Sequence, residues 1–214
     1  MTKLTGINIY DLLNRHEEFA TSLANVDDAL FVDWLDMIDQ AYWETAQDVV
    51  PEAFIKEGAK FTITSANLTE TVADLHSINS DGCGVFRLDS DDNIVNSDAS
   101  PSLIRTKRGS PNFGFWINDT IFTFTPITLT SSTDLKIRYI PDRTIITAKG
   151  NSLLIDTQYK AYALNAIKVL YQIWDENPSA AAITDNRFVN AMDKIWKSIR
   201  PDRSNSMEQF NNMY

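Results

Sequence analysis

The strongest strand signal in the chain is FGFWINDTIFTFTP, residues 113–126. Large apolar residues recur at every second position on both sides of Asn118-Asp119, which is the period of a half-buried strand. Asn and Asp tolerate the positive φ of a tight hairpin turn, and Pro126 closes the segment. The pattern therefore predicts a β-hairpin with its apolar positions at Phe113, Phe115, Ile117, Ile121, Phe122 and Phe124.

Shorter alternating segments surround this hairpin. They begin where the period changes to two at Lys60, and they are separated by polar, turn-rich sequence, above all between residues 89 and 111. Such spacing is typical of antiparallel strands joined by turns. The predicted strands lie at residues 61–63, 73–78, 85–88, 103–105 and 135–141.

Helical periodicity precedes the strands. Asp27 and Asp28 stand where an acidic residue favours a helix N-terminus, and Pro51 marks the end. Three further acidic residues, Asp33, Asp36 and Asp39, are predicted on or beside the solvated face. The apolar stripe consists of Leu30, Phe31, Trp34, Leu35, Ile38 and Tyr42. A shorter helix is also expected around residues 9–19.

Helical spacing resumes after the strands. One apolar stripe runs over residues 159–174 and ends at Asn177-Pro178, and a second runs over residues 183–199 and stops at Pro201. We therefore predict an α+β fold: a helical bundle from the N- and C-terminal segments, with an inserted antiparallel β block. The expected parts are residues 1–59 (helical), 60–150 (β-rich), 151–199 (helical) and 200–214 (an extended arm).

The charge is strongly acidic: 19 Lys and Arg against 29 Asp and Glu, a net charge of -10. A protein that grips nucleic acid through its phosphates needs clustered basic residues. We expect weak, transient contact with DNA at most, since an acidic wall lets a duplex slide past it. The basic cluster of Arg105, Lys107 and Arg108 is predicted to serve a subunit interface.

Residue types that carry chemistry are sparse. One cysteine and two histidines provide no intrachain disulfide and no zinc-binding pattern, and no phosphate-binding loop or nucleophile elbow is present. Asp89, Asp91 and Asn93 resemble the start of a calcium loop, but the later glycine and glutamate of that motif are missing. The sequence predicts a protein that is not an enzyme and has no catalytic residue, metal or cofactor.

No stretch approaches the roughly 20 apolar residues of a membrane span, and the first residues lack the apolar run of a signal peptide. The protein is expected in the cytosol or in a particle assembled there. Residues 200–214 are polar, yet they contain Met207, Phe210, Met213 and Tyr214. These spaced apolar residues predict a docking arm that orders on a partner.

The order of elements resembles the adaptor, or head-completion, proteins of tailed bacteriophages, including the tail tubular protein A type. The likeness covers roughly residues 25–199. An aromatic-rich helix leads into strands that close with NDTIFTFTP, residues 118–126. An exposed strand follows, LKIRYIP at residues 135–141, and then a two-helix segment starts near Leu153 with a tyrosine–alanine stretch at Tyr159 and Ala161.

This resemblance implies a homo-oligomeric ring, of twelve subunits by analogy, in the virion neck at the junction of portal and tail. The ring would be assembled in the host cytoplasm and bind the portal protein and tail or nozzle proteins. Its central helices would line or flank the channel used in DNA ejection, and the C-terminal arm would dock onto the portal.

Two other classes of function stay open. One is a different virion component, such as a tail terminator, a baseplate module or a receptor-binding β module, for which a β-dominated fold is expected. The other is a hydrolase that uses carboxylates in a cleft. Two or more acidic residues in a buried pocket, with raised pKa values, would favour that hydrolase.

Overall fold

The computed structural model describes residues 2–15, 19, 23–49, 51–95, 103–106, 114–125, 132–180 and 182–199. The chain divides into two compact units. Residues 1–49 and 143–214 form one, called the helical unit, and residues 50–142 form the other, called the β unit. Helices and antiparallel sheets are both present, so the predicted mixed α+β class is confirmed.

Four α-helices of the described residues belong to the helical unit: α1 (Gly6–Asn14), α3 (Asp28–Val49), α4 (Lys160–Glu176) and α5 (Asn186–Ile199). Short 3₁₀ turns precede α4 and α5 at Thr157–Tyr159 (η2) and Ala182–Thr184 (η3). A third, η1 (Pro51–Ala53), follows α3. The helices predicted near residues 30–42, 159–174 and 183–199 are confirmed.

Local chemistry sets the bounds of α3. The Asp27 carboxylate accepts the N–H of Leu30 at 2.7 Å, which is the hydrogen bond of an N-cap. The helix ends at Val49, two residues before Pro51. Five of its six predicted apolar residues are buried, with Leu35 and Ile38 fully inaccessible, and Leu30 is half-buried.

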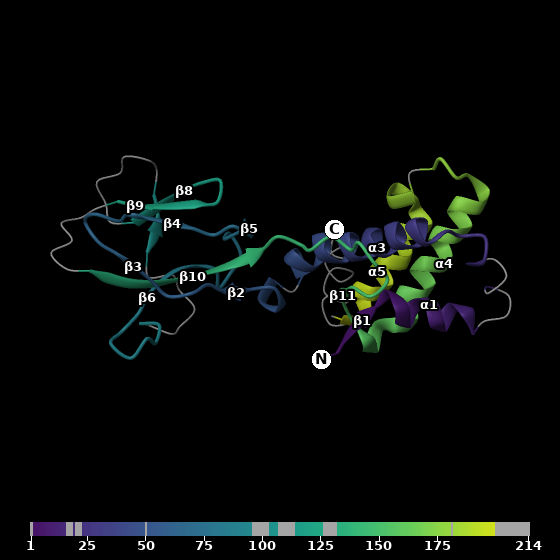
Figure 1. The fold of residues 1–214 in the computed structure, drawn as a ribbon, viewed down its shortest axis with the longest axis horizontal. Helices are drawn as coiled ribbons and strands as arrows, with labels where there is room; N and C mark the ends of the chain where they lie inside the picture. The colour runs from purple at the N-terminus through teal and green to yellow at the C-terminus, as the bar shows by residue number, and fades with distance from the viewer. Residues whose placement is uncertain are drawn as a thin grey trace, which may run out of the picture. The chain divides into compact units, whose positions relative to one another are not determined.

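Helix α4 packs against α1, α3 and α5 (Figure 1), and its buried residues are all apolar. Aromatic edges join α3 to α4, because Trp34 lies 6.4 Å from Tyr171 and 6.2 Å from Trp174 between ring centroids. Burying one large apolar side chain contributes about 1.5–3 kcal/mol, so this packing provides much of the unit's stability. The buried residues of α4 are Ala163, Ala166, Ile167, Leu170 and Ile173.

A two-stranded sheet in the helical unit was not predicted. Strand β1 (Lys3–Thr5) pairs antiparallel with β11 (Ser152–Asp156). The expected start of a helical segment near Leu153 is therefore wrong. Leu153 and Ile155 are buried and alternate with more exposed neighbours, but five residues of period two are easily merged with the helix that follows.

Nine strands of the described residues belong to the β unit. Within the described residues, β10 is paired with four other strands, and β4, β9, β8 and β7 form a second sheet in that order. All described pairs in the unit are antiparallel except β7 with β8. The strands are β2 (Lys56–Glu57), β3 (Phe61–Ile63), β4 (Thr69–Thr71), β5 (Leu75–Ser77), β6 (Gly84–Arg87), β7 (Ile104–Arg105), β8 (Gly114–Asn118), β9 (Ile121–Phe124) and β10 (Thr133–Pro141).

Strand β10 was expected to be exposed, and this is wrong. It pairs with β3 and β2 along one side and with β6 and β5 along the other. Leu135, Ile137 and Tyr139 are at most 3% exposed. Alternation alone reports one buried face, whereas the number of neighbouring strands depends on partners distant in sequence.

The predicted hairpin is confirmed as β8 and β9. Asp119 has φ 57°, the left-handed conformation that the Asn-Asp turn was predicted to need. Phe115, Phe122 and Phe124 join Leu135 and Ile137 in the core of the β unit. Phe113 and Pro126 lie outside the described residues.

Candidate functional site

A buried ionic cluster lies within the helical unit. Arg143 binds Asp36 through two hydrogen bonds, Nη1 to Oδ1 at 2.6 Å and Nη2 to Oδ2 at 3.0 Å. Its Nη1 also lies 3.4 Å from Oδ2 of Asp39. The side chains of Arg143 and Asp39 are only 10% and 1% exposed. Together these three residues, called the Arg143 cluster, join α3 to the chain that returns from the β unit.

Backbone N–H groups complete this cluster. Ile146 donates its N–H to Asp36 at 2.7 Å, and Leu154 donates its N–H to Asp39 at 2.6 Å. Asp36 and Asp39 thus hold both the segment after Arg143 and strand β11 against α3. Asp33, Asp36 and Asp39 were predicted on or beside the solvated face. Asp33 is exposed and the Asp36 side chain is 24% exposed, but the prediction is wrong for Asp39, which is buried because residues 143–155 cover it.

The pKa values of the two carboxylates are shifted in opposite directions. Burial raises the pKa of Asp39 to about 6, since its hydrogen bond from Leu154 and its longer contact with Arg143 do not offset desolvation. Burial also acts to raise the pKa of Asp36. The hydrogen bonds from Arg143 and Ile146, with the attraction of the guanidinium, outweigh burial and lower that pKa. The arrangement suits a structural ionic joint, in which every charged group has a partner.

A carboxylate hydrolase was expected to show raised pKa values on two acidic residues in a buried pocket. Asp39 has such a pKa, but its nearest acidic neighbour, Asp36, has a lowered one. Neither carboxylate lines the three depressions described below or the cavity beside Tyr139 in the β unit. The Arg143 cluster therefore does not have the geometry that would favour the hydrolase.

The calcium-like residues form a hydrogen-bonded turn. Asp89 accepts the N–H groups of Asp91 and Asn93, each at 2.9 Å, through the same carboxylate oxygen. Asp92, at φ 62°, follows in this turn. Among the residues that the structure describes, no group of three or more His, Cys, Asp or Glu is placed to hold a metal ion.

The predicted interface residues are described in part. Arg105 lies exposed on β7 and donates from Nη1 to Oδ1 of Asn79 at 2.9 Å. Lys107 and Arg108 lie outside the described residues, as do all four apolar residues predicted for the arm, Met207, Phe210, Met213 and Tyr214. The structure therefore does not test whether these predicted interface residues lie close together.

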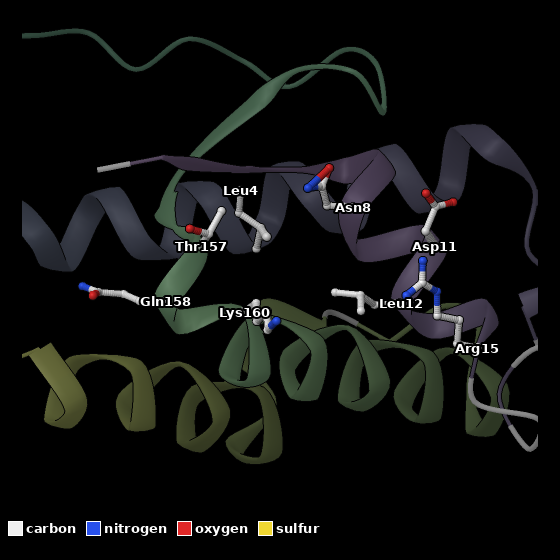
Figure 2. A pocket seen from close by; sticks show the side chains of 8 residues that line it. All are labelled: Leu4, Asn8, Asp11, Leu12, Arg15, Thr157, Gln158 and Lys160. Atoms are coloured by element: carbon white, nitrogen blue, oxygen red, sulfur yellow. The ribbon is translucent and has the colours of Figure 1, made fainter.

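Among the described residues of the helical unit, a first surface depression has a mixed polar lining and a volume of about 620 Å³. It lies between α1 and the start of α4 (Figure 2). Asn8, Asp11 and Arg15 border it from α1, and Gln158 and Lys160 border it from the other side. Its charges are of both signs, so its chemistry selects no particular ligand.

A second depression, called the α3–α5 groove, has a volume of about 280 Å³. Ala41 and Thr45 of α3 form one wall, and Met192 and Trp196 of α5 form much of the other. Val189, also on α5, is 50% exposed along this groove, and Ile183 of η3 is 38% exposed. The wall is mainly apolar, with acidic residues Glu44 and Asp193 at its margin.

The third depression, of about 700 Å³, lies between α3 and residues 145–149. Ile145, which lines it, is 64% exposed, and Ile7 at the start of α1 is 50% exposed. The N–H of Ile7 donates to the carbonyl of Lys149 at 2.8 Å, which holds α1 beside this segment. The Ile145 surface is defined as Ile145 and Val32 of this depression, together with the exposed Ile7, whose N–H is bonded to Lys149 of the same lining. The acidic Asp28 and Asp33 also line the depression.

Exposed large apolar side chains are concentrated in the helical unit. In the described chain, five such residues lie there and two, Val95 and Ile121, lie in the β unit. Single exposed apolar residues are ordinary, but grouped ones mark interaction sites. Periodicity could not find them, since they stand outside the apolar stripes. The five are Ile7, Ile145, Tyr162, Ile183 and Val189.

In comparisons with known proteins, no family model matches this chain, and no curated protein is significantly similar to it. Within the described ranges, no helix is both long enough and apolar enough to cross a membrane.

Proposed function

We propose that this chain is a structural head-to-tail connector, or adaptor, of a tailed bacteriophage. In this proposal it forms a ring between portal and tail, in the virion neck, through which DNA passes. The ring has twelve subunits by family resemblance, and its partners are the portal and the tail or nozzle proteins. The N- and C-terminal helices act as one bundle, and the β unit is inserted between them.

The observation that carries the proposal is the exposed apolar surface of the helical unit. Ile145 and Ile7 are at least half exposed, although each directly adjoins a buried residue, Ile146 and Gly6. Burying each one in a subunit contact would contribute about 1.5–3 kcal/mol. A ring that repeats this contact at every subunit multiplies the gain, and heterologous contacts close into such a ring.

The overall charge agrees with a channel for DNA. At a net charge of -10, the chain does not favour tight binding to phosphates. The proposed contact with DNA is weak and transient. Residues 200–214 act as the arm that docks onto the portal, and Arg105, Lys107 and Arg108 serve a contact between subunits.

The test substitutes the Ile145 surface. The double variant Ile7→Asp/Ile145→Asp should keep its melting temperature, since both side chains are exposed, but it should fail to form rings on the cognate portal. Val95→Asp is the matched control, because Val95 is 39% exposed in the β unit. Electron microscopy of the portal complex is the measurement. Rings of the double variant that equal those of the control would contradict this role.

A deletion tests the arm separately. Removing residues 203–214 should leave the fold of the helical and β units intact, because the described core ends before them. Attachment to the portal should be lost. If the truncated protein still joins heads to tails at normal efficiency, the arm is not the docking element.

A further inference from the structure

The α3–α5 groove is an apolar surface that the described residues leave partly open. Val189 and Ile183 are 50% and 38% exposed along it. Met192, Phe188 and Trp196 lie deeper and are each at most 8% exposed. The outer side chains therefore have apolar neighbours on one side and solvent on the other, which is the geometry of an acceptor for a further element.

Trp196 provides a second, independent observation. Its ring is 8% exposed and stacks on Tyr42, with the centroids 4.6 Å apart. Its Nε1 is buried and has no hydrogen-bond acceptor among the described residues. An indole N–H is a donor that buried sites normally satisfy. The buried N–H without an acceptor indicates that the packing around Trp196, at one end of the groove, is incomplete among the described residues.

The chain itself continues from the end of this groove. Helix α5 ends at Ile199, and the segment 200–214 follows directly. Met207, Phe210 and Tyr214 are spaced i, i+3, i+7, which is the anchor spacing of an amphipathic helix in an apolar groove. Pro201 cannot continue α5 and favours a turn at this point.

The distances allow the segment to return along α5. The ten steps of helix from Val189 to Ile199 rise about 15 Å at 1.5 Å per residue. Residues 200–205 span up to about 20 Å when extended, and antiparallel helices are commonly joined by short loops. In an antiparallel return, Met207 comes opposite Trp196, and Tyr214 comes opposite Val189.

We propose that residues 206–214 of the same chain dock in the α3–α5 groove as a short helix antiparallel to α5, with Met207, Phe210 and Tyr214 against its apolar wall. A helix this short is unstable alone, so it forms only on the groove. The inference does not depend on the adaptor function, because it concerns the isolated protein. In an adaptor, the groove and the portal compete for the same side chains.

Disulfide trapping in the full-length protein tests the proposal. The variant Val189→Cys/Tyr214→Cys should form an intramolecular disulfide under mild oxidation, read as a faster-migrating monomer on a non-reducing gel. The matched control is Asn190→Cys/Tyr214→Cys. Asn190 is exposed and equally far along the chain, but it does not line the groove. The native Cys83 is buried and is kept in both variants.

Docking raises the local concentration of one cysteine near the other. We expect the Val189 pair to cross-link about tenfold faster than the Asn190 pair. Equal rates would overturn the proposal. A cross-linked dimer in place of the monomer would also overturn it, because the occupant would then be the segment of a second copy.

Hydrogen exchange provides a test without cysteines. Phe210→Asp should raise amide exchange across residues 183–196, since the docked helix would be lost. Asn212→Asp is the control, because residue 212 falls on the opposite face of that helix, and it should leave exchange unchanged. Both variants keep the described core intact. If Phe210→Asp leaves exchange in residues 183–196 at the level of the control, the docking proposal is wrong.

Discussion

The helical unit and the β unit differ in how deeply their ion-paired side chains are buried. In the helical unit, Arg143 and Asp39 are 10% and 1% exposed, and their contact joins α3 to residues 143–155. In the β unit, Glu57 pairs with Lys136 and Arg138 on the surface of the sheet around β10. Those three side chains are between 24% and 39% exposed. In the helical unit a buried ionic cluster joins segments that are distant in sequence, whereas in the β unit apolar packing around β10 does so.

This difference has an energetic consequence. Removing one partner of a buried pair leaves an uncompensated charge and costs about 3–5 kcal/mol. Removing one partner of an exposed pair costs roughly 0–1 kcal/mol. The same substitution, Arg to Met, should therefore have unequal effects in the two units.

The largest expected effect is that of Arg143→Met. It leaves Asp39 buried without its cation and should lower the free energy of unfolding by about 3–5 kcal/mol. Arg138→Met in the β unit is the control and should cost about 1 kcal/mol or less. Urea denaturation of both full-length variants measures the two values. Equal losses of unfolding free energy in the two variants would contradict the proposed difference between the units.

The next effect concerns the apolar core of the β unit. Ile137→Ala on β10 removes a side chain that is 2% exposed and should cost about 2–4 kcal/mol. Hydrogen exchange should show the loss of protection in the strands paired with β10, while α3 and α4 keep theirs. Matching losses in both units would show that they do not have independent cores.

A third effect depends on pH. Folding raises the pKa of Asp39 from its ordinary value of 3.8 to about 6. A raised pKa means that the folded state favours the protonated carboxyl. The protonated carboxyl therefore contributes its full stabilisation of the folded state below about pH 4, and this stabilisation is lost as the pH rises through 6. Asp39→Asn cannot ionise and lacks this dependence.

Stability of the wild type relative to Asp39→Asn should therefore fall between pH 4.5 and 7.5, by about 2 kcal/mol. The measurement is denaturation of both proteins across this range. Asp36 has a lowered pKa, so its own contribution has the opposite sign and is lost as the pH falls. A difference between the two proteins that does not change with pH would contradict the burial of Asp39.

The smallest effect is expected at the hairpin turn. Asp119 has φ 57°, and glycine adopts this conformation without steric cost. Asp119→Gly should change the free energy of unfolding by less than about 1 kcal/mol, whereas Asp119→Val should cost more because a β-branched residue is strained there. Thermal melts of the pair measure this. A Val variant as stable as the Gly variant would contradict the turn geometry.

Elements with strong local patterns were predictable from the sequence. The hairpin around Asp119 and the helices α3, α4 and α5 each combine a clear period with an end signal, such as Asp27 or Pro51. Strand β11 was missed because its two buried residues, Leu153 and Ile155, are too few to separate it from α4. The position of β10 was misjudged because its partners are spread over residues 56–87.

The candidate site was less predictable than the fold. The helical pattern predicted Asp36 and Asp39 on or beside the solvated face, because it carries no information about their partner, Arg143, which is more than 100 residues away. Burial by a distant segment leaves no trace in helical periodicity. Conversely, Ile145 and Val189 resemble ordinary apolar residues, and only the fold shows that they are exposed.

The central claim is that the chain builds a ring at the portal–tail junction. Electron microscopy of the chain bound to its cognate portal, with determination of mass and symmetry, tests it most directly. The account predicts a closed ring of identical subunits, twelve by resemblance, with the helical units in mutual contact through the Ile145 surface. Particles in which the chain is present as single, unassociated copies would contradict it.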